Sequence, residues 1–193
     1  MRKYMNISKE IIKTTEYLKK GSAILYPTDT IWGLGCDASN SVAIDRVFAI
    51  KQRRLSKSLI ILLDEAEKLP LYIEHIPEIA WDLIEQASRP TTFIYKGVKN
   101  LPKNLIAQDG TIAIRIVRNE FCKRLISLLG SPIVSTSANV SGMPTPVSFN
   151  QISDSIKNQV DYIVDTSISH VEDVKPSTLI RFIDDYSFEV IRD

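Results

Sequence analysis

Hydrophobic and polar residues alternate along the chain in a pattern that predicts strands and helices in turn. Short apolar runs predict strands at 22–26, 59–63, 91–95, 111–117, 131–136, 162–164, 178–183 and 188–191. Apolar residues at helical spacing predict helices over 7–20, 40–51, 77–84 and 119–129, with a short helix opening at Ser148. The alternation predicts an α/β fold, in which helices pack on an open, twisted, mixed and mostly buried β-sheet.

Residues with special roles at helix ends support these boundaries. Asn40 and Asn119 can each accept hydrogen bonds from the free N–H groups of a first helical turn. Gly21 and Gly130 stand where two predicted helices end, as helix-terminating glycines do. The chain shows no internal repeat and no clear linker, so we expect residues 1–193 to form a single domain.

Two polar clusters follow predicted strands. The first lies in Tyr26-Pro-Thr-Asp-Thr-Ile-Trp-Gly-Leu-Gly-Cys-Asp37, and the second in Ile133-Val-Ser-Thr-Ser-Ala-Asn-Val-Ser-Gly142. In each cluster an apolar run stops at small polar side chains and glycine, which bring hydroxyls and uncovered backbone N–H groups to one place. Such a place suits a small polar or anionic ligand. We therefore predict one ligand site built from both clusters.

A basic cluster, Lys51-Gln-Arg-Arg-Leu-Ser-Lys57, ends the second predicted helix. It has two interpretations: a solvated helix end, or a clamp for a polyphosphate. Arginine offers a planar fork to phosphate oxygens, and lysine offers a mobile point charge. We expect Lys51 and Arg53 to lie outside the core, so that replacing either one leaves the fold intact.

The composition is that of an ordinary soluble protein. Charge, cysteine and histidine content argue against a membrane protein, a disulfide-stabilised protein and a zinc protein. The net charge is +1, which gives no long-range attraction for nucleic acid or membrane. Cys36 and Cys122 show no pairing pattern, and we find neither a signal peptide nor an apolar run long enough to span a membrane, so we expect a cytoplasmic protein. With His75 and His170 standing singly, neither a zinc site nor a Ser-His-Asp triad is predicted.

Standard nucleotide-binding signatures are absent from the sequence. It contains neither G-x-x-x-x-G-K-[ST] nor G-x-G-x-x-G. We interpret Gly33-Leu-Gly35 by itself as a tight turn. Catalysis would then depend on positioning and charge neutralisation rather than on a protein nucleophile.

The order of these motifs resembles the YrdC family. The segments that carry the resemblance are Tyr26-Pro-Thr-Asp-Thr30, Gly33-Leu-Gly-Cys-Asp37, Lys51-x-Arg53, Thr136-Ser-Ala-Asn-x-Ser-Gly142 and Pro176-Ser-Thr178. The resemblance runs from about Ser22 to Arg192. It implies a YrdC-like fold with a concave basic cavity. It also implies an L-threonylcarbamoyladenylate synthase, a nucleotidyltransferase that makes threonylcarbamoyl-AMP and pyrophosphate from L-threonine, bicarbonate and ATP.

The same resemblance implies partners. The adenylate would pass to a tRNA threonylcarbamoyl-transferase complex that modifies adenosine 37 of tRNA. Mg²⁺ would accompany ATP, and no metal tightly bound by protein ligands is expected. Direct contact with tRNA or double-stranded RNA is left open, and no membrane partner is expected.

The resemblance assigns roles to individual residues. Lys51 and Arg53 are implied to be catalytic. The threonine-binding positions are Thr30, Arg115, Ser135 and Ser177, and Arg115 would hold the carboxylate by two parallel hydrogen bonds. The ATP-binding positions are Lys51, Arg53, Lys57, Thr111, Ser137, Asn139, Thr145 and Arg192. The sequence departs from the family pattern at Arg54, where many relatives have proline, and at Leu62, where many have histidine.

An alternative is a double-stranded RNA-binding or ribosome-associated protein of the same fold, without significant synthase activity. Its cations would then grip a phosphate backbone. The residues favour the synthase, because RNA binding has no use for the hydroxyl set of Thr30, Ser135 and Ser177.

Overall fold

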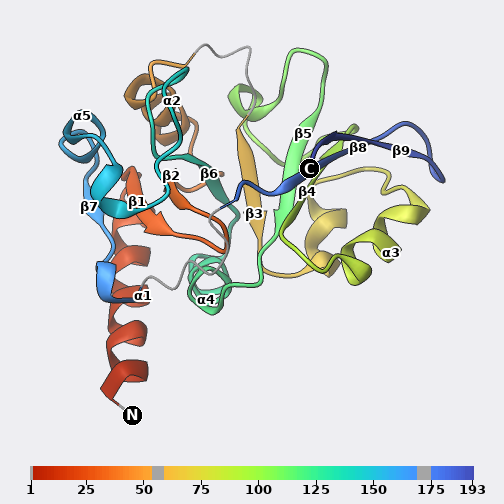
Figure 1. Ribbon diagram of the computed structural model, residues 1–193. Coiled ribbons are helices and arrows are strands. Elements are labelled where there is room, and N and C mark those ends of the chain that lie inside the picture. The colour runs from red at the N-terminus through yellow and green to blue at the C-terminus, as the bar shows by residue number, and fades with distance from the viewer. Residues whose placement is uncertain (1, 54–58, 169–174) are drawn as a thin grey trace.

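A computed structural model describes residues 2–53, 59–168 and 175–193 (Figure 1). Within these residues the strands form one nine-stranded sheet, in the order β7-β1-β2-β6-β3-β5-β4-β8-β9. The strands are β1 (Ile24–Pro27), β2 (Trp32–Gly35), β3 (Ile60–Leu63), β4 (Thr91–Tyr95), β5 (Ile112–Ile116), β6 (Ile133–Ser137), β7 (Tyr162–Ile163), β8 (Thr178–Phe182) and β9 (Phe188–Arg192). Because β3 pairs with β5 in parallel and with β6 antiparallel, the predicted mixed sheet is confirmed.

Helices flank this sheet. They are α1 (Arg2–Lys19), α2 (Ser41–Ile50), α3 (Glu78–Gln86), α4 (Glu120–Leu129) and α5 (Asp154–Lys157), and short 3-10 turns occupy 66–71, 103–105, 149–151 and 166–168. The predicted caps are confirmed: Asn40 accepts hydrogen bonds from the first turn of α2, and Asn119 from that of α4. Gly130 ends α4 in the left-handed conformation, with φ of 81°. Helix α1 begins earlier than the pattern from Ile7 predicted.

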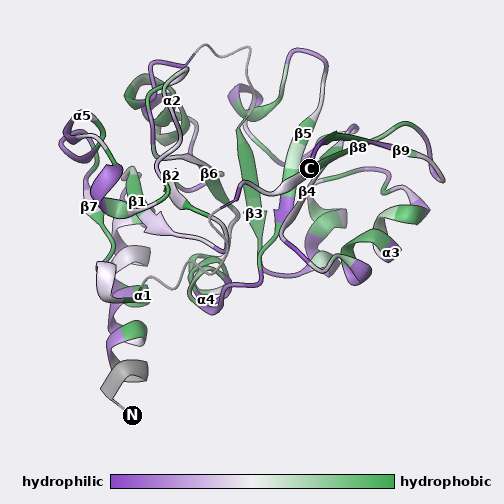
Figure 2. Cartoon of the chain, in the orientation of Figure 1, coloured by the Kyte–Doolittle hydropathy of each residue, from purple (hydrophilic) through white to green (hydrophobic). Residues whose placement is uncertain are grey.

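The sheet buries hydrophobic side chains on both faces. In β3, Ile61 and Leu63 belong to a cluster with residues of α2 and α3, whereas Leu62 belongs to a second cluster with α1 and α4. Successive side chains of a strand point to opposite faces, so a strand covered on both faces needs a continuous apolar run. Figure 2 shows this run as the hydrophobic strand at the centre of the sheet.

The interpretation of Gly33-Leu-Gly35 as a tight turn was wrong, because these residues lie in β2, between β1 and β6. A side chain at Gly35 would place its Cβ 2.0 Å from the carbonyl oxygen of Val134 in β6. Glycine therefore allows the backbones of two strands to approach closely. The residue type alone does not show whether a glycine serves this role or forms a turn. The edge strand β9 is exposed throughout, so the expectation of a mostly buried sheet fails at that edge.

Candidate functional site

A cavity of about 200 Å³ opens on the face of the sheet that carries α1 and α4. Strand register explains why it lies there. Ile60 is paired with Ser135 and Leu62 with Arg115, so these four side chains share one face. On either side of β3 this face carries a polar side chain, Arg115 in β5 and Ser135 in β6. The lining residues are Thr28, Thr30, Ile31, Gly33, Arg53, Leu59, Ile60, Arg115, Ser135, Thr136, Ser137, Thr145, Pro176, Ser177 and Arg192.

The first polar cluster enters the cavity through a tight turn after β1. Thr28 Oγ1 donates a hydrogen bond to the carbonyl oxygen of Ile31 at 2.7 Å and accepts one from the backbone N–H of Thr30 at 3.1 Å. A hydroxyl that bonds to nearby backbone in this way stabilises a chain reversal. The turn therefore leads β1 into β2 and places the Thr30 hydroxyl, 3.1 Å from that of Thr28, at the cavity wall.

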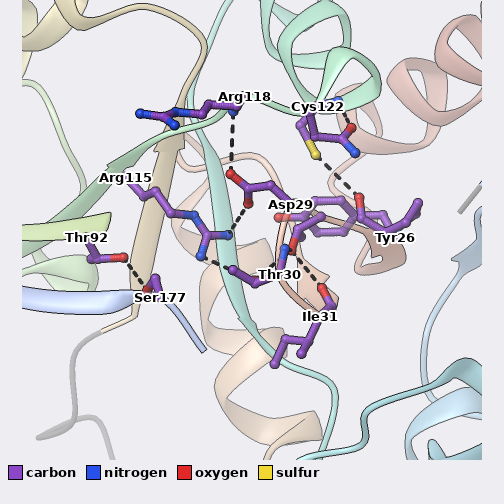
Figure 3. A network of polar contacts seen from close by, with 12 residues as sticks. Tyr26, Asp29, Thr30, Ile31, Thr92, Arg115, Arg118, Cys122 and Ser177 are labelled. Carbon is purple, nitrogen blue, oxygen red and sulfur yellow. Dashed lines mark hydrogen bonds and ion pairs between the residues drawn. The ribbon is translucent and has the colours of Figure 1, made fainter. Parts of the chain in front are cut away.

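Arg115 is a buried cation near the end of β5. Its Nη2 lies 3.1 Å from Asp29 Oδ1, and its Nη1 donates a hydrogen bond to Thr30 Oγ1 at 3.4 Å (Figure 3). The two charged side chains are only 5% and 8% exposed. Among the described residues, Arg115 Nε is buried and has no hydrogen-bond partner. A buried donor without a partner is costly. The Arg115 side chain also lines the cavity, where it can meet an anionic ligand.

Ser177 reaches the cavity from the segment that precedes β8. Its hydroxyl is 2.7 Å from the hydroxyl of Thr92 in β4, with either oxygen able to donate (Figure 3). The Ser177 carbonyl oxygen accepts two hydrogen bonds from Arg192, at 3.1 and 2.8 Å. Arg192 therefore ties β9 to this segment while lining the cavity. Burial, and secondly the charge of Arg115, lower the pKa of Arg192.

Lys51 is buried, so the expectation that it lies outside the core was wrong. It follows α2 and is 1% exposed, and its Nζ donates to the carbonyl oxygens of Ser137 and Asn139 at 2.5 and 2.7 Å. Its own carbonyl oxygen accepts from the N–H of Ser141 at 2.9 Å. Burial, followed by the charge of Arg53, lowers its pKa to about 8. Lys51 thus fastens the loop of the second polar cluster to the end of α2.

The structure brings together most of the residues that the sequence assigned to the site. Eight of them line the cavity: Thr30, Arg53, Arg115, Ser135, Ser137, Thr145, Ser177 and Arg192. Three others, Lys51, Thr111 and Asn139, are not among the lining residues. The Thr111 hydroxyl donates to Asp109 Oδ1 at 2.6 Å, and Asn139 Nδ2 donates to the carbonyl oxygen of Met143 at 2.6 Å. Lys57 lies outside the described residues, as do Arg54 and His170.

Arg53, Arg115 and Arg192 supply three cations to the wall, and no aspartate or glutamate is among the lining residues of the described chain. Burial lowers the pKa of Arg53. These are cations that the sequence assigned to the site, although the basic character of the whole cavity stays a prediction. Leu62 packs with α1 and α4 and does not line the cavity.

Two contributors to the site were missed at the sequence level. Asp29 lies inside the first motif, and its charge was the feature that could have marked it as part of the site. Its contact with Arg115 could not be predicted, because it depends on two distant segments of the chain meeting in space. Thr92 lies in an otherwise apolar strand, and no local pattern marks it. Its contact with Ser177 follows from the parallel pairing of β4 and β8.

The family described as telomere recombination, Sua5/YciO/YrdC, matches residues 16–193. The chain belongs to the Sua5/YciO/YrdC family. It is 38% identical over 165 residues to the threonylcarbamoyl-AMP synthase of Pseudoalteromonas translucida, an alignment that covers 84% of this chain and 87% of that protein. The resemblance inferred from the motifs is thereby confirmed.

Solved structures of this family agree with the fold. The crystal structure of P. abyssi Sua5 complexed with L-threonine superposes with a TM-score of 0.87 at 27% identity and covers 96% of this chain. The chain spans 54% of that longer protein. E. coli YciO superposes with a TM-score of 0.79 at 29% identity, covering 95% of this chain and 88% of its own. The YrdC-like fold is therefore confirmed.

Two further features of the molecule bear on the function. Within residues 2–53, 59–168 and 175–193, no group of three or more His, Cys, Asp and Glu side chains could hold a metal ion. In the same part of the chain, every helix is too short or too polar to cross a membrane. The prediction that the protein binds no metal tightly stays a prediction.

Proposed function

We propose that this protein is a threonylcarbamoyl-AMP synthase, which forms threonylcarbamoyl-AMP and pyrophosphate from L-threonine, bicarbonate and ATP. One observation carries the proposal: the buried Arg115, with a donor that lacks a partner, faces a cavity lined by the hydroxyls of Thr30, Ser135 and Ser177. A guanidinium binds a carboxylate, and hydroxyls bind the polar atoms beside it, so this wall suits an α-amino acid. The names of the relatives support the same substrate, since a Sua5 structure contains L-threonine.

The size of the cavity supports threonine as its occupant. About 200 Å³ is below the roughly 300–1,000 Å³ of pockets that hold drug-sized ligands. We therefore place threonine inside the cavity and much of ATP beyond it. Ile31, Leu59 and Ile60 supply apolar wall for the threonine methyl group. A pocket for one methyl group discriminates against serine by about 1–3 kcal/mol.

The chemistry follows from these groups in two steps. The threonine amine attacks the carbon of bicarbonate, a water molecule leaves, and a carbamate forms. A carbamate oxygen then attacks the α-phosphorus of ATP, the bond to the β-phosphate oxygen breaks, and pyrophosphate leaves. Negative charge stays on phosphate oxygens throughout, so Arg53 and Arg192 would act by holding that charge, and Mg²⁺ would arrive with the phosphates.

The product is a reactive mixed anhydride, which we propose is consumed by a tRNA threonylcarbamoyl-transferase complex acting on adenosine 37. Pyrophosphate release tests the proposed function. The wild-type protein should release pyrophosphate only when threonine, bicarbonate and ATP are all present, and serine should support the reaction poorly. Equal release without threonine would refute the proposal.

The alternative of an RNA-binding protein stays a prediction. This alternative predicts a different result: the protein should bind double-stranded RNA strongly at low salt, and the affinity should fall steeply as salt is added. Strong RNA binding together with no threonine-dependent pyrophosphate release would favour the alternative. The hydroxyl-lined wall around Arg115 is the feature that favours the synthase.

A further inference from the structure

We propose that Asp29 is a positioning residue, which holds the Arg115 guanidinium in the orientation that binds the threonine carboxylate. The inference rests on the proposed function and deepens it. Asp29 does not line the cavity, so it would act on threonine only through Arg115.

Asp29 contacts the Arg115 side chain on one side and the backbone of Arg118 on the other. Asp29 Oδ1 lies 3.1 Å from Arg115 Nη2, and Asp29 Oδ2 accepts a hydrogen bond from the backbone N–H of Arg118 at 3.4 Å (Figure 3). Arg118 follows β5, the strand that carries Arg115, and its guanidinium donates in turn to the carbonyl oxygen of Ala87. The carboxylate is thus held between the Arg115 side chain and the backbone at the end of the same strand.

Arg115 needs such a partner. Its side chain has several rotatable bonds, and a buried guanidinium without a counterion is strongly destabilising. Asp29 supplies the counterion before any ligand arrives, at one nitrogen, while Thr30 accepts from a second nitrogen at 3.4 Å. The remaining Nε is buried and has no hydrogen-bond partner in the described chain. The pairing therefore orients the guanidinium, which still lines the cavity.

The experiment measures binding of L-threonine and of ATP separately by calorimetry. Asp29→Asn keeps the size of the side chain but removes the charge that pairs with Arg115, and its amide group has one oxygen in place of two. Misplacing a group in an active site by about 1 Å can lower a reaction rate about 100-fold, so a smaller displacement of the guanidinium should still weaken its contact with threonine. We expect the Kd for threonine to rise about tenfold and the Kd for ATP to stay within about twofold of the wild-type value. Asp82→Asn, an exposed change on α3, is the matched control and should alter neither Kd.

A double-mutant cycle separates positioning from a general structural role. If Asp29 acts through Arg115, adding Asp29→Asn to Arg115→Lys should change the threonine Kd by less than about twofold. Multiplying losses would overturn the inference, as would an unchanged threonine Kd in the folded single variant. If Asp29→Asn does not fold, Asp29→Glu keeps the charge but displaces it by one methylene, and it should also weaken threonine binding selectively. Failure of the wild-type protein to bind threonine would overturn the proposed function, and this inference with it.

Discussion

Replacing Lys51 by methionine is expected to destabilise the fold as well as impair the reaction. Methionine keeps the length of the side chain and removes its donors. In the wild-type protein Lys51 Nζ bonds to two backbone carbonyl oxygens of the segment 137–139, at 2.5 and 2.7 Å. In Lys51→Met both oxygens lose this donor, and the buried methionine side chain offers no replacement.

Two opposing terms set the magnitude. Hydrogen bonds from a charged donor contribute about 1.5–3 kcal/mol each, so the two bonds contribute about 3–6 kcal/mol. Against this, burial and Arg53 lower the pKa of Lys51 from 10.5 to about 8, which corresponds to about 3 kcal/mol disfavouring the ammonium form in the folded state. The stabilisation from the two hydrogen bonds therefore slightly exceeds the penalty for burying the ammonium group. Lys51→Met should lower the free energy of unfolding by about 2 kcal/mol. For a chain of this length Tm should then fall by about 4–8 °C.

Thermal unfolding followed by circular dichroism measures this effect. Lys96→Met, a change of the same kind at an exposed position, is the control and should leave Tm within about 1 °C. Activity should be measured at a temperature where both variants are folded, so that loss of the loop contact is separated from unfolding. If Lys51→Met melts like the wild-type protein, the two carbonyl contacts do not hold the loop, and Lys51 is free to contact phosphate as the family resemblance implied.

Three further predictions test other parts of the molecule. Arg115→Lys keeps the charge but loses the planar fork, so threonine affinity should fall at least about tenfold with little change for ATP; equal losses in calorimetric titrations of both ligands would contradict the carboxylate assignment. Gly35→Ala should prevent folding, as seen by circular dichroism, because its Cβ would lie 2.0 Å from a carbonyl oxygen of β6, whereas Gly110→Ala meets no atom within 4 Å and should cost only about 1 kcal/mol of left-handed strain. Burial raises the pKa of the Cys36 and Cys122 thiols, so both should react with a thiol reagent at pH 7 only at the rate of unfolding; rapid labelling of the native protein would show that the thiols are accessible.

The sequence predicts the parts of the fold that depend on local pattern. Apolar runs located the central strands, because a strand buried on both faces needs hydrophobic residues at successive positions. Asn40, Asn119 and Gly130 marked helix ends through interactions made within a few residues. Strand β2 was missed because its two glycines carry no apolar pattern. The requirement for Gly35 comes from β6, about a hundred residues away in the chain.

In the candidate site, too, the residues marked by a local motif were predicted, whereas the roles set by contacts between distant segments were not. Thr30 lies in the turn after β1, Ser135 lies within β6, and Ser177 directly precedes β8. A short motif in the sequence identifies each of them. Lys51 and Asp29 were harder, since charge in a sequence suggests a surface or a ligand contact, whereas both charges here are buried and bound to protein atoms. Lys51 holds the loop of the second cluster, and Asp29 holds Arg115. Both support the cavity from outside its wall, so a motif can include such residues without indicating whether they contact the ligand or the residues that do.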